Sequence, residues 1–242
     1  MSRIFLPLLL TLCLAQNSFA DLPHNSHGSD HQKIFHAFTV EADAGKARDG
    51  STKSWDLDGW VGSDYNKLWL KSEGKKFGKY DKKSEVQALY SKNIEQFWDA
   101  QIGVRHDFKT DFSSHSVDYL TIGFEGLAPY FFETNAEFFV SDARNFSARL
   151  KQEIELRITQ KLITQHYFEA DFFAQDVKKL EVRSGLSELE IGNLLRYEIT
   201  HKFLPYLALR YNRKTFGTAD LANELNDRVS NFVADVRIRF KL

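Results

Sequence analysis

The chain has 242 residues, with 32 Lys and Arg against 33 Asp and Glu, so its formal net charge is −1 at pH 7. A charge so close to zero gives no indication of a nucleic-acid partner or of a strongly charged one. The length suits one sizeable domain, and the single cysteine excludes a disulfide framework within the chain.

Residues 1–20 have the pattern of a secretory signal peptide. Arg3 supplies a positive charge, and residues 4–14 form an apolar run shorter than the ~20 residues of a membrane-spanning helix. A Ser-Phe-Ala sequence that ends at residue 20 resembles a cleavage site. We therefore expect an exported mature chain that begins near Asp21 and lacks Cys13. A lipoprotein anchor at Cys13 is disfavoured, because the residue before it is a leucine.

Residues 21–33 form a short polar segment, which we expect to be flexible and periplasmic. Four of the eight histidines of the chain lie within or just after it. They are His24, His27, His31 and His36. Neutral imidazole binds copper, Cu(II) in particular, and a flexible segment can wrap several such rings around one ion. The alternative is a polar linker whose histidines bind nothing specific.

From residue 34 onward, apolar and polar residues alternate with a period of two. Between residues 146 and 158, for example, Leu150 and Ile154 share one face, whereas Lys151 and Glu153 share the other. A β-strand separates these two sets completely, whereas a helix mixes them. The sequence therefore predicts an all-β fold, a closed antiparallel transmembrane β-barrel over residues 34–242. The predicted strands, about twelve in number, span 34–43, 54–63, 67–74, 84–93, 97–108, 117–127, 131–140, 146–158, 162–174, 188–199, 203–212 and 231–240.

The connections between the predicted strands alternate in length. Short connections fall at 64–66, 94–96, 128–130, 159–161 and 200–202, and longer ones at 75–83, 109–116, 141–145, 175–187 and 213–230. This alternation is typical of barrels in the outer membrane. Aromatic residues are expected at the strand ends, as in interfacial girdles, at Trp55, Phe97, Trp98, Tyr130, Phe131, Phe203 and Tyr206. A soluble β-sandwich or lipocalin-like barrel is the alternative, with its apolar face turned inward.

The polar faces of the predicted strands carry charges of both signs, and we expect them to point into the barrel. The acidic residues of this set are Glu133, Glu137, Glu153, Glu155, Glu169, Asp171, Glu188, Glu190 and Glu198. The basic ones are Arg105, Arg149, Lys151, Arg157, Arg196, Arg237 and Arg239. Opposite charges on neighbouring strands can pair and fill the interior. A path for cations along the carboxylates is the alternative.

The other four histidines are scattered over the predicted barrel, at His106, His115, His166 and His201. His166 falls on an otherwise lipid-facing row, which suggests a position near the barrel rim. His106 precedes Asp107 at a strand end, where a metal site is conceivable. The sequence contains no Gly-x-Ser-x-Gly, no His-Glu-x-x-His and no glycine-rich phosphate loop, so we do not expect an enzyme.

Five blocks of sequence resemble the copper resistance protein B family of outer-membrane proteins, in order and from about Ser54 to the C-terminus. They are Gly59 to Gly74 (GWVGSDYNKLWLKSEG), Glu85 to Ser91 (EVQALYS), Trp98 to Arg105 (WDAQIGVR), Gly126 to Glu133 (GLAPYFFE) and Gly185 to Glu190 (GLSELE). The resemblance implies an outer-membrane barrel that contributes to copper resistance. It also implies copper ions as the bound species, a periplasmic multicopper oxidase as partner, and no established reaction.

The chain departs from this family in its N-terminal segment. Many members carry a methionine- and histidine-rich stretch there, whereas Met1 is the only methionine of this chain. Thioether sulfur is the ligand that suits soft Cu(I), so the four N-terminal histidines remain as the candidate copper ligands. A general small-solute pore without specific metal binding is the main alternative function, and an outer-membrane enzyme is a further one.

Overall fold

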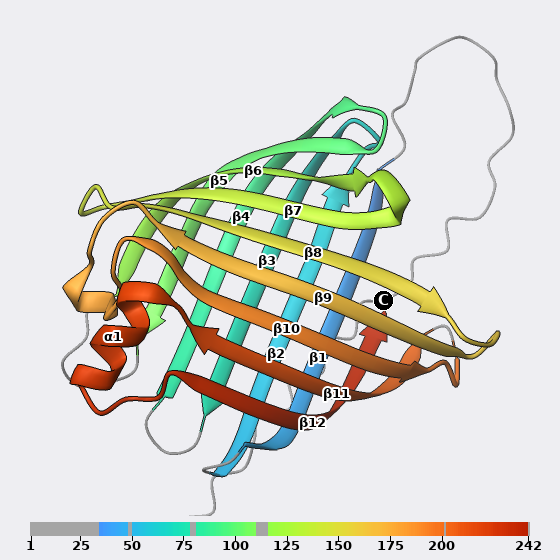
Figure 1. The fold of residues 1–242 in the computed structure, drawn as a ribbon. Coiled ribbons are helices and arrows are strands. Elements are labelled where there is room, and N and C mark those ends of the chain that lie inside the picture. Colours follow the sequence, from blue (N-terminus) through green and yellow to red (C-terminus); the bar gives the residue numbers. More distant parts are fainter. Residues whose placement is uncertain (1–33, 48–49, 78–80, 110–115, 201, 242) are drawn as a thin grey trace, which may run out of the picture. The chain divides into compact units, whose positions relative to one another are not determined.

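The computed structural model describes residues 34–47, 50–77, 81–109, 116–200 and 202–241. Each strand in this part of the chain pairs antiparallel with the next, and β1 pairs with β12, so that the sheet closes into a barrel (Figure 1). The strands are β1 (Phe35–Ala47), β2 (Gly50–Gly62), β3 (Asn66–Phe77), β4 (Asp81–Glu95), β5 (Trp98–Lys109), β6 (Val117–Ala128), β7 (Phe132–Ser141), β8 (Phe146–Arg157), β9 (Leu162–Phe173), β10 (Gly185–Tyr197), β11 (Phe203–Lys214) and β12 (Ser230–Lys241). The predicted closed twelve-stranded barrel is confirmed. The sequence placed the strands correctly and underestimated mainly how far β1 to β4 and β10 extend.

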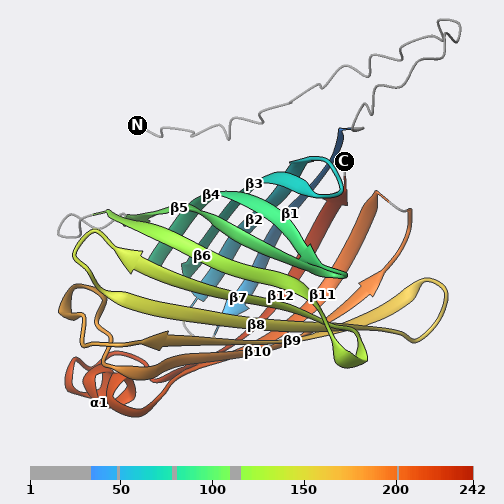
Figure 2. The ribbon, with the colours of Figure 1, turned by 90° about the horizontal axis from the view of Figure 1, so that it is seen from above.

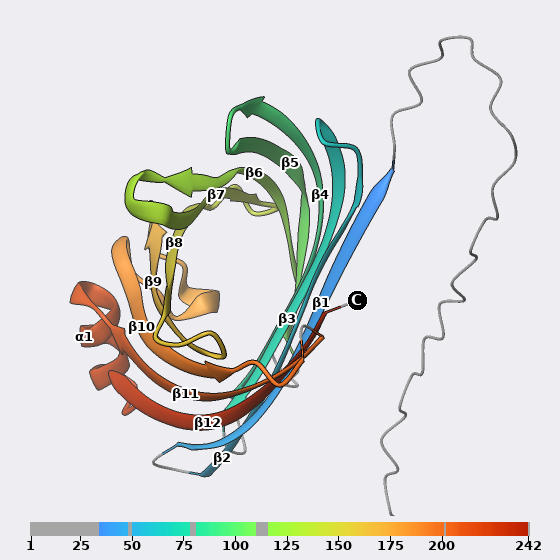
Figure 3. The same ribbon diagram turned by 90° about the vertical axis from the view of Figure 1, so that its right-hand side faces the viewer.

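The apolar side chains of the strands face outward, and the charged ones face inward. Leu70, Val104 and Leu207 are 46%, 60% and 59% exposed on strands from different sides of the wall. Arg196 and Asp235, by contrast, are buried inside. An apolar outer surface is unfavourable in water and favourable in lipid, so this arrangement is the reverse of a soluble barrel. The strands that form the wall are tilted (Figure 1), and Figure 3, which looks from the right-hand side of Figure 1, shows how they curve around the barrel.

Exposed aromatic side chains mark the rim that carries the short turns. Tyr65, Phe97, Tyr130 and Phe131 lie in three of these turns, and each is at least 63% exposed. Tyr130 and Phe131 adopt positive φ angles of 65° and 66°, a conformation that is costly for bulky residues. Rings held outward at this level match the interfacial girdle of membrane proteins. The predicted aromatic rim is thus confirmed at Phe97, Tyr130 and Phe131, and Tyr65 is an exposed ring that the prediction did not include.

Tyr206 does not belong to the girdle, contrary to the prediction. It is only 1% exposed and points into the barrel, where Arg239 lies 4.8 Å from the centre of its ring. The reason is parity, because Phe203 and Leu207 on the same strand face outward and leave the even positions inside. Trp55 faces outward, but it lies in the body of β2 rather than at its end, because β2 begins at Gly50.

The opposite rim carries the two longest described connections, between β9 and β10 and between β11 and β12. The second contains α1 (Phe216–Glu224), which lies beside β10 and β11 (Figure 2). The backbone N–H of Arg183 donates to Thr218 Oγ1 (3.0 Å), which ties the β9–β10 connection to α1. In the same connection the Ser184 N–H donates to Asp176 and holds the pKa of that carboxyl below its usual value. Within the described residues, no helix is long and apolar enough to span a membrane.

The predicted contrast between short and long connections fails at two of the five positions where a long connection was predicted. β3 continues to Phe77 and β4 starts at Asp81, so most of the long connection predicted at 75–83 is strand. Similarly, only four residues separate Ser141 from Phe146. Charged residues such as Lys75 and Lys76 interrupt the apolar row and resemble a loop in sequence, but the paired neighbouring strand keeps them extended.

Candidate functional site

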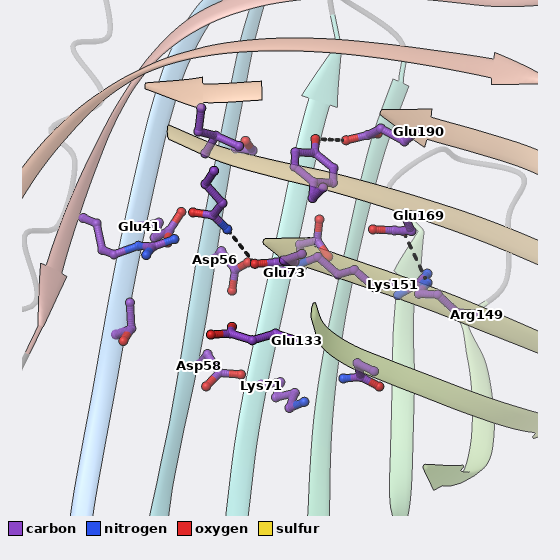
Figure 4. Close-up of a pocket in the computed structure, with 18 of the residues that line it drawn as sticks. Glu41, Asp56, Asp58, Lys71, Glu73, Glu133, Arg149, Lys151, Glu169 and Glu190 are labelled. Atoms are coloured by element: carbon purple, nitrogen blue, oxygen red, sulfur yellow. Dashed lines mark hydrogen bonds and ion pairs between the residues drawn. The ribbon is translucent and has the colours of Figure 1, made fainter. Parts of the chain in front are cut away.

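The barrel interior contains a cavity of about 710 Å³, which we call the lumen cavity (Figure 4). At ~30 Å³ for each water molecule, it has room for roughly two dozen waters, which suits small ions. Its acidic lining residues are Glu41, Asp43, Asp56, Asp58, Glu73, Glu85, Glu125, Glu133, Glu137, Glu153, Glu155, Glu169 and Glu190. Its basic ones are Lys71, Lys75, Arg149, Lys151, Arg210, Arg237 and Arg239.

The lining of the lumen cavity is acidic, although the whole chain is almost neutral. Thirteen carboxylates and seven basic groups line it, and two further arginines, Arg105 and Arg196, pair with lining carboxylates, which leaves an excess of four acidic groups, compared with a net charge of −1 for the chain. A low-dielectric wall around an excess of one sign concentrates the field in the cavity. The lumen cavity therefore favours cations over anions.

Much of the interior charge is paired across strands. Arg105 on β5 and Arg149 on β8 both reach Glu85 on β4, at 2.7 and 3.2 Å. Arg149 also contacts Asp171 on β9 at 3.1 Å. Similarly, Lys71 contacts Glu125 at 3.0 Å. The Arg149–Glu85 and Lys71–Glu125 bridges link strands that are not neighbours, so they cross the interior and hold its walls together, whereas the other two bridges join neighbouring strands. The predicted pairing of opposite charges in the interior is therefore confirmed for this part of the lumen.

A second network lies at the seam where the first and last strands meet. Arg237 Nη1 and Nη2 on β12 contact Glu41 and Asp43 on β1, each at 3.0 Å. Arg239 bonds Glu41 as well, and Arg210 on β11 reaches Asp43 at 3.4 Å. Because Asp43 and Arg237 are directly opposite in the register, these pairs join the two ends of the barrel wall.

Four carboxylates of the lumen cavity have no ion pair or hydrogen bond within the described residues. They are Asp56 and Asp58 on β2, and Glu133 and Glu137 on β7. Glu137 Oε1 is buried without a partner. Carboxylate oxygens bind hard divalent cations and accept Cu(II), but they are poor ligands for Cu(I). These four residues are therefore the groups of the cavity most available to a passing cation.

The predicted histidine site falls largely outside the described part of the chain. This applies to His24, His27 and His31, so their grouping stays a prediction. His36 is described, and it is exposed on the outward side of β1, with its ring 6.4 Å from that of Phe38. No group of three or more His, Cys, Asp or Glu with metal-binding geometry occurs among the described residues.

The other two described histidines also face away from the lumen cavity. His106 Nδ1 lies 2.5 Å from Asp118 Oδ1 on β6. Asp107 turns inward and accepts a hydrogen bond from Arg105 at 2.6 Å, so the adjacent His106 and Asp107 do not form a site together. His166 lies on the outer wall as the fifth residue of β9, rather than at the rim.

The sequence identified ten of the lining residues of the lumen cavity. They are Glu133, Glu137, Glu153, Glu155, Glu169, Glu190, Arg149, Lys151, Arg237 and Arg239. It missed those on β1 to β4, on β6 and on β11, which are Glu41, Asp43, Asp56, Asp58, Lys71, Glu73, Lys75, Glu85, Glu125 and Arg210. The same period of two would have assigned them to the inner face. Glu198 lies beyond the end of β10, at the rim.

Residues 34–240 match the sequence model of a family described as Copper resistance protein B precursor (CopB). A Copper resistance protein B homolog of Pseudomonas syringae pv. tomato is 35% identical over 219 residues, which cover 90% of this chain and 73% of that protein. Copper resistance protein B of Escherichia coli is 34% identical over 189 residues, which cover 77% of this chain and 63% of that protein.

Solved porins share the fold of the barrel. The NanC porin superposes with a TM-score of 0.59 at 13% identity, over 84% of this chain and all of that one. The KdgM porin gives a TM-score of 0.52 at 10% identity, over 84% of this chain and 98% of the other. At such low identity, the likeness concerns the architecture of the wall alone.

Proposed function

The chain belongs to the copper resistance protein B family, and from this premise we propose that it is an outer-membrane protein that binds copper ions and helps to sequester or export periplasmic copper. Family membership together with the acidic lining of the lumen cavity carries the proposal. An excess of acidic groups raises the local concentration of cations, which favours binding or passage of copper ions. We include in the proposal the export of the chain through a signal peptide cleaved after residue 20.

The N-terminal histidines and the carboxylates of the lumen cavity would bind copper with different affinities. His24, His27, His31 and His36 supply imidazole nitrogen and would hold the ion. The unpaired carboxylates of the lumen cavity supply weaker oxygen ligands, and weak successive contacts let an ion move on rather than remain bound. A periplasmic multicopper oxidase would be the natural partner, because it would supply oxidised copper, the form that both ligand types accept.

The direct test is the copper content of the purified full-length protein after equilibration with Cu(II). We expect bound copper to fall strongly when the four N-terminal histidines are replaced together by alanine. His106→Ala is the matched control, since this residue is a barrel histidine engaged with Asp118, and it should leave the copper content unchanged. Equal copper content in all three proteins would remove the histidines from the proposal.

A growth assay tests the cellular role separately. A strain that lacks the gene should lose tolerance across a copper series, and the gene should restore it. Unchanged growth would contradict a role in copper resistance, even if the purified protein binds the ion.

A general small-solute pore is the second candidate, and the porin-like fold around the lumen cavity supports it. In planar bilayers such a pore would conduct ordinary salts at a rate that micromolar copper does not change. A change of conductance with copper would favour the first proposal. An enzymatic role has less support, because the described histidines all face outward and no imidazole base lies among the described lining residues of the lumen cavity.

A further inference from the structure

Four adjacent strands carry polar side chains on the outer, lipid-facing wall. We call this group the outer polar patch, and it consists of Thr134 on β7, Gln152 on β8, Thr164 and His166 on β9, and Asn193 on β10. The Asn193 amide nitrogen donates to Thr164 Oγ1 and to His166 Nδ1, at 3.0 Å each. Gln152 Nε2 donates to Thr134 Oγ1 at 3.4 Å. The patch therefore consists of two hydrogen-bonded groups on neighbouring strands, Thr134 with Gln152 and Thr164 with His166 and Asn193.

The outer polar patch lies near the middle of the wall. Gln152 is the seventh of the twelve residues of β8, His166 the fifth of twelve in β9, and Asn193 the ninth of thirteen in β10. At ~3.3 Å for each residue and a tilt of ~40°, His166 and Asn193 lie about 10 Å from the nearer rim. An outer-membrane barrel presents an apolar band about 25 Å tall, so these groups lie within it.

The rest of the wall is apolar at the same depth. Leu70, Ile102, Leu207 and Val236 occupy comparable outward positions on β3, β5, β11 and β12, and each is at least 46% exposed. The outward residues that pair directly with the patch are also apolar, for example Ile154 opposite His166 and Leu209 opposite Asn193. Ser72 is an isolated exception on β3. The polarity is thus confined to one sector of the barrel.

Some of the hydrogen-bonding capacity of the patch is unused. Because the Asn193 amide donates to His166 Nδ1, the imidazole proton lies on Nε2, and this N–H has no partner among the described residues. Asn193 Oδ1 and Gln152 Oε1 likewise accept no hydrogen bond there. His166 is exposed to the membrane side of the wall. Lipid tails offer neither donors nor acceptors, so a monomer in the bilayer leaves these groups unsatisfied.

We propose that the outer polar patch is an interface for a second copy of this chain, which packs against it across a two-fold axis in the membrane. The patch offers one imidazole N–H donor and two amide carbonyl acceptors. It is therefore self-complementary, as an isologous contact requires. In such a pair, His166 Nε2–H of each copy donates to an amide oxygen of the other. Hydrogen bonds of this kind between outward polar side chains stabilise association within membranes.

The chemistry of the patch fits other occupants less well. It contains no charged side chain, because its one imidazole accepts a hydrogen bond and is neutral. It also lies at the depth of the acyl chains, so it does not fit an anionic lipid headgroup. It contains one imidazole only, and one nitrogen of that ring already accepts from Asn193, so it is a poor metal site. The inference is independent of the proposed copper function.

Cross-linking through an engineered cysteine tests the proposal in lipid vesicles. A chain that begins at Asp21 has no cysteine, because Cys13 is the only one in the sequence. Leu195→Cys places a thiol on the next outward position of β10 after Asn193, opposite Thr164. With a short bis-maleimide we expect covalent dimers. The matched control is Leu70→Cys on β3, an outward residue 46% exposed, which should give few.

Two further variants keep the engineered thiol and lose the hydrogen-bonding groups of the patch. They are His166→Leu and Asn193→Leu, each in the Leu195→Cys background. Each should weaken dimerisation about tenfold, as the loss of paired membrane hydrogen bonds predicts. A heat-dependent shift on gels confirms that each variant is folded. Equal cross-linking of Leu195→Cys and Leu70→Cys would overturn the proposal, and so would undiminished dimers without the patch. Dimers that require added lipopolysaccharide would assign the patch to that lipid instead.

Discussion

Replacing Arg237 by methionine should weaken the seam that closes the barrel. Arg237 on β12 contacts both Glu41 and Asp43 on β1 at 3.0 Å, and the side chain of Asp43 is only 2% exposed. Methionine keeps most of the volume and removes the charge. Both carboxylates then lose a bridging partner in a poorly hydrated part of the wall.

The size of this stability loss depends on the ion pairs that remain after the substitution. Removal of one partner from a buried ion pair costs about 3–5 kcal/mol, because the other charge remains buried. Here Arg210 still lies 3.4 Å from Asp43, and Arg239 still bonds Glu41, so the loss should fall at the lower end. A loss of about 3 kcal/mol corresponds to a change of roughly a hundredfold in the unfolding equilibrium.

Urea unfolding of the protein in lipid vesicles, followed by tryptophan fluorescence, measures this loss. The matched control is Arg157→Met, because Arg157 lies exposed at the end of β8 and makes no ion pair among the described residues. That control should change the free energy of unfolding by less than about 0.5 kcal/mol.

An equal free energy of unfolding for Arg237→Met and Arg157→Met would refute this reasoning. A second substitution sharpens the test, since Asp43→Asn in the Arg237→Met protein removes the unpaired carboxylate and should restore part of the stability. If the stability losses of Arg237→Met alone and Asp43→Asn alone simply add in the double variant, the seam does not depend on this ion pair.

Three further predictions concern the cavity, its packing and the outer rim. Neutralising Asp58 and Glu133 by Asp58→Asn and Glu133→Gln should lower the preference of the pore for cations. The measurement is the reversal potential across a salt gradient, which should become smaller. An unchanged potential would show that these carboxylates do not set selectivity. Gly192→Val should destabilise the barrel by about 1–3 kcal/mol in urea, because a Cβ there would lie 1.9 Å from the Tyr167 ring, and a stable variant would mean that the ring can move away. Thr218→Val removes the hydrogen-bond acceptor that ties α1 to the β9–β10 connection. The local stability should fall by about 1 kcal/mol, and proteolysis of that connection should increase. Unchanged cleavage would contradict this role of Thr218.

Local patterning predicted most of the wall. In β8, Leu150 and Ile154 alternate with Lys151 and Glu153, and the structure turns the first pair outward and the second inward. Side chains on successive strand residues must point to opposite faces, so this assignment needs no knowledge of neighbouring strands. The same rule, applied to β11, would have placed Tyr206 inside, and the prediction for that residue was wrong because it relied on residue type instead of parity.

The features that matter for function depend on the register between strands. Arg237 finds Asp43 some 190 residues away because closure of the barrel pairs β12 with β1. His166 and Asn193 meet on the outer wall because β9 and β10 align them, and in sequence they are two unrelated polar residues. The helix α1 was also absent from the prediction, which treated its segment as a plain connection.

The sequence by itself thus determined an alternating chain of about twelve strands, the face on which most of the assigned residues lie, and the family to which the chain is similar. Only the tertiary structure decided which charges of the lumen are paired, which four carboxylates have no partner among the described residues, and where the polar sector of the outer wall lies. The physical reason is that a period of two is a property of a single strand. The partners of a side chain, by contrast, are fixed by hydrogen-bonded register and by closure of the sheet.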